Sequence, residues 1–171
     1  MRKFLSWIVG ALKLPKRVIT REDDSPYLER YYLAGDPGAL RYFPAAAREM
    51  RWWQRALTKL PCIYVHRFVA SDSDEELHNH PWEATSIILA GGYVEERRRR
   101  VGSEKTFKQV FLPFMTNRIF ADTFHKVTLI ERDAWTLIIC GKKVSTWGFW
   151  HPRTNETVHW REHMARRSRK S

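Results

Sequence analysis

The sequence predicts an all-β sandwich or barrel, because strand-like runs follow one another from Cys62 to Trp150. Turn signals separate these runs about every ten residues, which is typical of sandwiches and barrels. No internal repeat interrupts the series. The predicted strands are Ile63–Val69, Leu77–His80, Thr85–Val94, Thr106–Leu112, Asn117–Phe120, His125–Ile130, Trp135–Cys140 and Ser145–Trp150, with 97–104 as a polar hairpin loop.

Two further strands and one helix precede this series. Arg17–Thr20 and Tyr27–Leu33 read as strands joined by the turn 22–26. A helix is expected at about 44–59, since Pro44 suits a first helical turn and Pro61 ends the pattern. Apolar side chains recur there at spacings of four and three, which marks one helix face. They are Ala46, Met50, Trp53, Leu57 and Leu60.

A chain of 171 residues is long enough for one domain with extensions. We predict an apolar and basic segment at 1–16, one domain at 17–160 with its barrel at 62–150, and a basic tail or frayed helix at 161–171. The N-terminal run is too short to span a bilayer, so it packs on the domain or lies on a membrane surface. Cys62 and Cys140 form no CxxC pair, and both are expected to be buried thiols.

The chain is strongly basic, with 30 Lys and Arg against 19 Asp and Glu and a net charge of +11. The excess gathers at the N-terminus, in the run Arg97 to Arg100 and in the C-terminal tail. Such a balance favours nucleic acid by counterion release, and it equally serves as solvated surface charge. Both interpretations stay open from the sequence.

The strongest chemical signal is His78-Asn79-His80, followed by Pro81-Trp82 and later by His125. Side chains at i and i+2 of an extended strand point to one face, so His78 and His80 can aim two imidazoles at one point. A third histidine from a neighbouring strand completes a set for a divalent metal. The alternative is a pair of ordinary polar strand residues.

These motifs resemble the cupin superfamily. His78 and His80 match the histidine pair of its first motif, Gly92 the closing glycine, and His125 the histidine of its second motif. The resemblance covers about 64–141 and implies a cupin-type jelly-roll barrel. Cupins usually carry a glutamate ligand where this chain has Thr85, so the resemblance implies a three-histidine site like that of thiol dioxygenase cupins, with Fe(II) as metal and Zn, Mn or Ni as alternatives.

Four other polar residues are candidates for function. Tyr93 and Glu95 share one strand face and are predicted to orient a ligand or move protons, with a salt bridge as the alternative for Glu95. Arg118 and Arg132 flank the second motif. Either would clamp a carboxylate if it pointed inward, or else it points to solvent.

The chain also resembles small cupin-like proteins of bacteria and phages, through segments such as His78–Trp82 and Trp147–Trp150. That resemblance implies a cytoplasmic protein, and it leaves a homodimer open. We therefore expect a mononuclear non-haem iron oxygenase acting on a small polar molecule. The alternatives are a binding module for a small ligand, nucleic acid or protein, and a metal-assisted sugar isomerase or epimerase.

Overall fold

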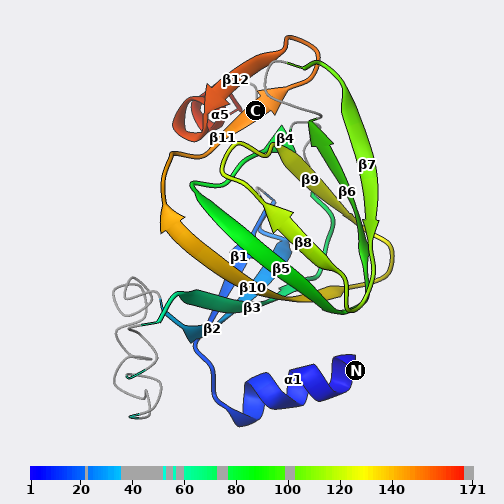
Figure 1. The fold of residues 1–171 in the computed structure, drawn as a ribbon, viewed down its shortest axis with the longest axis vertical. Helices are drawn as coiled ribbons and strands as arrows, with labels where there is room; N and C mark the ends of the chain where they lie inside the picture. Colours follow the sequence, from blue (N-terminus) through cyan, green and yellow to red (C-terminus); the bar gives the residue numbers. More distant parts are fainter. Residues whose placement is uncertain are drawn as a thin grey trace.

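The computed structural model of this chain describes residues 1–21, 23–35, 52, 56, 60–72, 77–98 and 103–167. Two six-stranded sheets lie face to face (Figure 1). The first has the order β1-β2-β3-β10-β5-β8 and the second β12-β11-β4-β9-β6-β7. The bounds are β1 Lys16–Thr20, β2 Pro26–Ala34, β3 Cys62–Phe68, β4 Leu77–His78, β5 Trp82–Ala90, β6 Tyr93–Arg98, β7 Thr106–Phe111, β8 Thr116–Ile119, β9 His125–Leu129, β10 Ala134–Lys143, β11 Gly148–His151 and β12 Glu156–His159.

The predicted all-β fold is confirmed, and every pairing between these strands is antiparallel. β5 shows how the sequence specifies it. Its even-numbered residues from Ala84 to Ala90 are buried, and the odd-numbered ones between them are partly exposed. This period of two places one face of the sheet against the core. The core therefore lies between the two sheets, where Ile88, Tyr93 and Val127 pack together.

One predicted strand was wrong. The apolar run Thr85–Val94 is divided between β5 and β6, which belong to different sheets. Gly91 makes the break with φ of +73°, and a Cβ there would lie 2.2 Å from the carbonyl oxygen of Asp133. Only glycine tolerates both the left-handed backbone and this close approach. The apolar run continues across the turn because both strands contribute to one core.

The other elements follow the predictions with differences at the ends. β1, β2 and β12 lie outside 62–150 yet pair within the same two sheets. β12 was not predicted, and it leads directly into the helix α5 (Trp160–Arg167). The helix expected at 44–59 lies outside the described residues, apart from Trp52 and Ala56. Cys62 and Cys140 are cross-strand neighbours, with Cys140 buried and Cys62 half-buried, and they form no disulfide.

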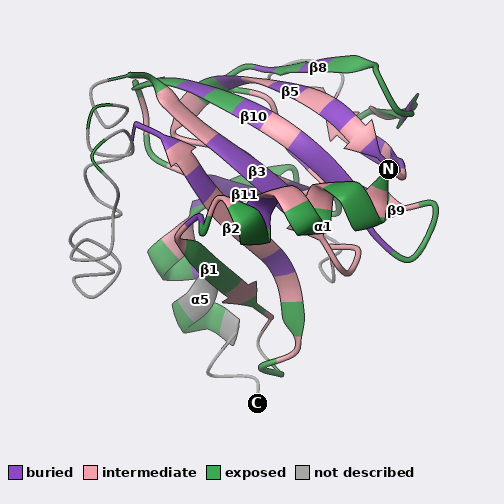
Figure 2. Ribbon diagram, turned by 90° about the horizontal axis from the view of Figure 1, so that it is seen from below, coloured by how far each residue is buried: buried purple, intermediate pink, exposed green. Residues whose placement is uncertain are grey.

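The N-terminal segment forms a helix, α1 (Arg2–Ala11), which lies across the outer face of the first sheet (Figure 2). Val9 and Leu5 pack against Trp135 and Val65. The opposite side of α1 leaves Phe4 and Trp7 exposed. Of the two alternatives expected for this segment, packing on the domain is the one that these contacts show. Among the described helices, none is both long enough and apolar enough to cross a membrane.

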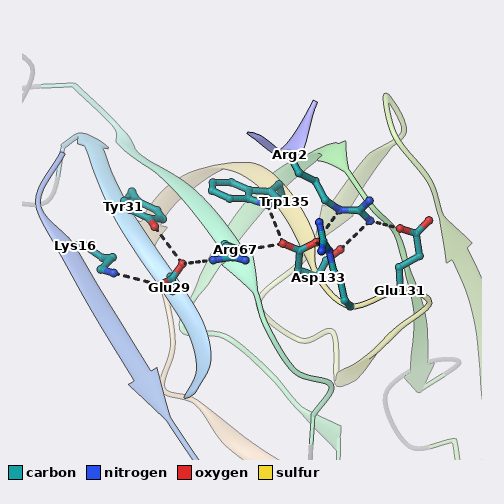
Figure 3. A network of polar contacts seen from close by, with 9 residues as sticks. Arg2, Lys16, Glu29, Tyr31, Arg67, Glu131, Asp133 and Trp135 are labelled. Carbon is teal, nitrogen blue, oxygen red and sulfur yellow. Dashed lines mark hydrogen bonds and ion pairs between the residues drawn. The ribbon is translucent and has the colours of Figure 1, made fainter. Parts of the chain in front are cut away.

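A chain of polar contacts joins α1 to the sheet (Figure 3). The buried carboxylate of Asp133 pairs with Arg2 at 2.7 Å and with Arg67 at 3.0 Å, and it accepts a hydrogen bond from the Trp135 indole at 3.3 Å. Arg67 also pairs with Glu29 at 3.2 Å. Burial, followed by the charge of Glu29, raises the pKa of Tyr31 to about 12. This network holds α1 on the outer face of the first sheet, and the functional site lies on the inner face of that sheet.

Candidate metal centre

A cavity of about 630 Å³ opens between the two sheets. Strands of both sheets contribute to its wall, so its residues come from most of the chain. The lining is largely aromatic and aliphatic, and polar groups gather at a few points, as in small-molecule sites. These include the histidines His66, His78, His80, His125 and His163 and the arginines Arg17, Arg21 and Arg30.

Three of these histidines form one cluster, as the sequence predicts. His78 on β4 is paired in register with His125 on β9 and with Phe149 on β11. His80 follows β4 by two residues and turns its ring to the same point. One ring nitrogen from each of the three lies within 4.8 Å of the others. The pairing of β4 with β9 therefore brings together histidines that are far apart in the sequence.

Asn79 explains how the histidine pair is held. Its side-chain amide donates to the carbonyl of Ala121 at 2.8 Å, and its side-chain oxygen accepts from the backbone N–H of Gly148 at 2.7 Å. Its own N–H donates to the Gly148 carbonyl at 3.1 Å. The residue between the histidines thus ties β4 to two neighbouring segments and points its flanking imidazoles into the cavity.

The donor set fits a divalent metal. The Nε2 atoms of His80 and His125 are 2.9 Å apart. Two nitrogens that each lie about 2.1 Å from a metal, at right angles, are separated by about 3.0 Å. The rings of His78 and His125 have centroids 4.9 Å apart, and those of His78 and His80 5.2 Å. Three imidazoles on one side suit iron, zinc, copper or nickel and leave further positions open.

Glu95 contacts the cluster through Nδ1 of His125, on the side of the ring away from the other two histidines. It is 0% exposed, and one carboxylate oxygen contacts Nδ1 of His125 in a short hydrogen bond. The other oxygen accepts from Arg97 at 2.8 Å and from Asn117 at 2.9 Å. A carboxylate on Nδ1 holds the proton there, so the lone pair of His125 lies on Nε2 and faces the cluster. This arrangement is typical of histidines that bind metals.

Electrostatics keep these groups in useful protonation states. Burial holds the pKa of His80 well below 6.5, and the charge of Arg30 adds to this effect, so its imidazole is neutral. Burial alone would raise the pKa of Glu95, but the hydrogen bond with His125 and the charge of Arg97 outweigh it and lower that pKa. Burial raises the pKa of Tyr93 to about 12, so Tyr93 stays protonated.

Tyr93 and Glu95 lie side by side on the inner face of β6, as predicted. Both line the cavity, and Asn117 bridges them by donating to the Tyr93 hydroxyl at 3.0 Å and to Glu95. The sequence showed that the two residues share a face. It did not show that Asn117 on β8 would link them, because that contact crosses between sheets.

Of the two alternatives expected for Arg118 and Arg132, pointing to solvent is the one observed, and neither residue lines the cavity. Arg118 is exposed and stacks on Phe120 at 4.9 Å, and Arg132 is 78% exposed. Arg30, which sequence reasoning did not single out, lines the cavity instead. The alternation within β2 could have identified Arg30. Leu28, Arg30 and Tyr32 share one face of this strand, and the residues between them face outward. Thr85, at the position where the resemblance expects a glutamate ligand, is on the outer face of β5 and outside the histidine cluster.

No family model matches this chain, and no curated protein matches it. Several solved structures share its fold. The DMSP lyase DddQ from Ruegeria pomeroyi DSS-3 aligns with a TM-score of 0.53 at 14% identity over 83% of this chain and 64% of that one. A chain from the structures of the DMSP lyases RdDddP and RnDddQII gives 0.51 at 16% identity, over 76% and 58%.

Two further structures widen the range of functions on this fold. HppE with Fe(II) and substrate aligns with a TM-score of 0.51 at 10% identity, over 75% of this chain and 57% of that one. Drosophila melanogaster CENP-C bound to CAL1 gives 0.51 at 11% identity, over 82% and 95%. The chain spans less than two thirds of the enzymes it matches. At these identities the likeness establishes a cupin-like fold and nothing finer.

Proposed function

We propose that this chain is a metal-dependent enzyme, a mononuclear non-haem iron oxygenase that acts on a small polar molecule. His78, His80 and His125 would hold the metal. The observation that carries the proposal is the approach of three ring nitrogens within 4.8 Å of one another in the wall of the cavity between the two sheets. Fe(II) is the preferred ion, with Zn, Mn and Ni as alternatives, because the comparison structure HppE holds Fe(II) on this fold.

When bound, a ferrous ion supplies redox chemistry toward dioxygen and open coordination positions for a substrate. The chain's own residues do the rest. Glu95 holds His125 in one tautomer through the contact at Nδ1. Tyr93 stays protonated because burial raises its pKa to about 12, so it is suited to donate a hydrogen bond to a bound substrate. The general-base role that the sequence predicts for Glu95 remains a prediction.

Aromatic side chains pack against two of the three histidines. His80 stacks on Trp82 with ring centroids 4.5 Å apart and planes 3° apart. On the other side, His78 contacts Phe149 with centroids 6.3 Å apart. Aromatic packing on both outer histidines restricts their rings to the orientation that faces His125. A site held this rigidly needs little reorganisation when a ligand enters.

The test is metal content by elemental analysis of untagged protein after anaerobic reconstitution with Fe(II), followed by oxygen uptake with candidate substrates. About one equivalent is expected in the wild type, and much less in His78→Ala and His125→Ala. His159→Ala is the matched control, because His159 is exposed on β12 and outside the cluster. Equal metal in wild type and both cluster variants would overturn the proposal.

A second candidate is a binding module without turnover. The observation that favours it is the structure of CENP-C bound to CAL1, a protein complex on this fold. Binding of nucleic acid or of another protein would then account for the basic surface. Retained metal without oxygen uptake or any other turnover, together with salt-sensitive binding to random DNA or RNA, would select this candidate. Turnover that needs the metal but no oxygen would select a lyase or isomerase.

A further inference from the structure

One wall of the cavity carries a row of polar side chains that the metal cluster does not use. Arg30 on β2 is paired in register with His66 on β3, and His66 with Thr136 on β10. Residues opposite one another on antiparallel strands point to the same face. All three line the cavity that also holds the three-histidine cluster. The row therefore faces the space where a substrate would lie.

Arg30 is held in place by neutral partners. Its Nε–H donates to Nε2 of His66 at 3.0 Å, and its guanidinium lies 4.9 Å from the centroid of the Tyr64 ring. Burial, with the charge of Arg30, keeps the pKa of His66 well below 6.5, so His66 remains a neutral acceptor. Within the described part of the chain, no carboxylate forms an ion pair with Arg30. The remaining N–H groups of the guanidinium retain their capacity to bind an anion.

Thr136 provides an independent observation. The residue is 1% exposed, and its hydroxyl has no hydrogen-bond partner among the described residues. A buried hydroxyl without a partner costs stability, so its retention in a cavity wall points to a partner that arrives from outside. The hydroxyl is in the same row as His66 and Arg30, so it would donate to a ligand that extends along this row.

The charge of the lining favours an anion as well. Arg17 and Arg21 line the cavity together with Arg30. The two carboxylates of the lining, Asp72 and Glu95, are already committed within the protein. Asp72 accepts from the backbone N–H of Val127 at 2.6 Å, and Glu95 contacts His125, Arg97 and Asn117. An anionic group that enters therefore meets arginine charge that these carboxylates do not fully neutralise.

We infer that Arg30 and Thr136 form an oxyanion subsite, and that the substrate is a small molecule with a carboxylate or a similar planar or tetrahedral oxyanion. The planar guanidinium suits such groups because two N–H donors match two oxygens. This inference rests on the proposed function, since it names the substrate class of the same cavity. The subsite would anchor one end of the molecule and leave its other end toward the histidines.

The test uses propionate as the probe and the uncharged propionamide as its matched comparator. Binding is followed by NMR titration on full-length protein in two states, metal-stripped and loaded with Zn(II). Propionate is expected to saturate both states, and propionamide to bind at least about tenfold more weakly, since a charge-assisted bidentate contact is worth about 1.5–3 kcal/mol. Binding in the metal-stripped state separates the subsite from direct ligation by the metal.

Variants then locate the subsite. Arg30→Gln is expected to weaken propionate about tenfold or more, and Thr136→Val less, about two- to tenfold. Arg132→Gln is the control, because Arg132 is 78% exposed and does not line the cavity. If Arg30→Gln does not fold, Arg30→Lys is used instead. Lysine retains the charge but loses the two N–H donors that match two oxygens, so weaker propionate binding is still expected. The wild-type comparison of propionate with propionamide needs no variant.

The outcomes are distinct. Equal binding of propionate and propionamide, or wild-type propionate affinity in Arg30→Gln, would overturn the subsite while the metal content of the protein stays as measured. Propionate binding that depends on Arg30 in a protein that takes up no metal would retain the subsite and overturn the enzyme proposal instead.

Discussion

Glu95 on β6 contacts Nδ1 of His125 on β9, thirty positions away, and neither residue is open to solvent. The contact places a negative charge directly behind one member of the histidine cluster. It also leaves Nε2 of His125 facing Nε2 of His80 at 2.9 Å. Glu95 therefore links β6 to the histidine cluster and orients the ring of His125.

Replacing Glu95 with Gln is therefore expected to weaken metal binding. The amide removes the charge that holds the proton on Nδ1, and losses of such partners typically cost about 10–100-fold in metal affinity. The measurement is competition with a chelator of known affinity, using Zn(II). Glu96→Gln is the control, because Glu96 contacts Thr106 and Lys126 away from the cavity. Unchanged affinity in Glu95→Gln would show that His125 is oriented by other contacts.

Acid is expected to destabilise the metal-free protein through His66. The pKa of folded His66 lies well below 6.5 because the ring is buried beside Arg30, so below about pH 6.5 only the unfolded chain takes up this proton. The free energy of unfolding then falls as pH drops, by up to about 1.4 kcal/mol per pH unit for this group. His80 contributes with the same sign.

The measurement is urea unfolding between pH 7 and 5. His66→Gln should flatten the pH dependence without removing the part due to His80, and His159→Gln, at an exposed position, should not change it. An identical slope in wild type and His66→Gln would contradict the assignment to His66.

Asp133 is expected to hold α1 on the sheet. Asp133→Asn leaves the guanidinium groups of Arg2 and Arg67 without their shared buried carboxylate. Removing one partner of a buried pair costs about 3–5 kcal/mol, and the partial exposure of both arginines reduces the expected loss to about 2–3 kcal/mol. Thermal and urea unfolding measure it. Asp122→Asn, at an exposed turn position, should change stability by less than about 0.5 kcal/mol.

Two glycines should respond in opposite directions to alanine. Gly91→Ala forces a left-handed residue and a Cβ 2.2 Å from the Asp133 carbonyl oxygen, so a loss well above about 1 kcal/mol is expected. Gly10→Ala places a methyl group within α1 where no atom lies within 4 Å, and about 0.5–1 kcal/mol should be gained. Unfolding free energies compare the two, and a neutral Gly91→Ala would contradict the strained turn.

Much of the fold could be predicted from the sequence. The period of two in β5 and the repeated turn signals are local, and they are sufficient for an all-β assignment. The break at Gly91 was harder to find, because the apolar pattern continues through it. Gly91-Gly92 is visible in the sequence, but its meaning depends on Asp133 in a distant loop. A local pattern cannot show that two runs enter different sheets.

The sequence by itself determined the alternation of buried and exposed residues, and it brought His78 and His80 together through their spacing. Only the tertiary structure decided which distant groups meet them. His125 joins the cluster because β9 pairs with β4, Glu95 reaches His125 because β6 pairs with β9, and Arg30 meets His66 because β2 pairs with β3. Backbone hydrogen bonds between strands set these registers, and such bonds are the same for every side chain, so the sequence of one strand does not name its partner.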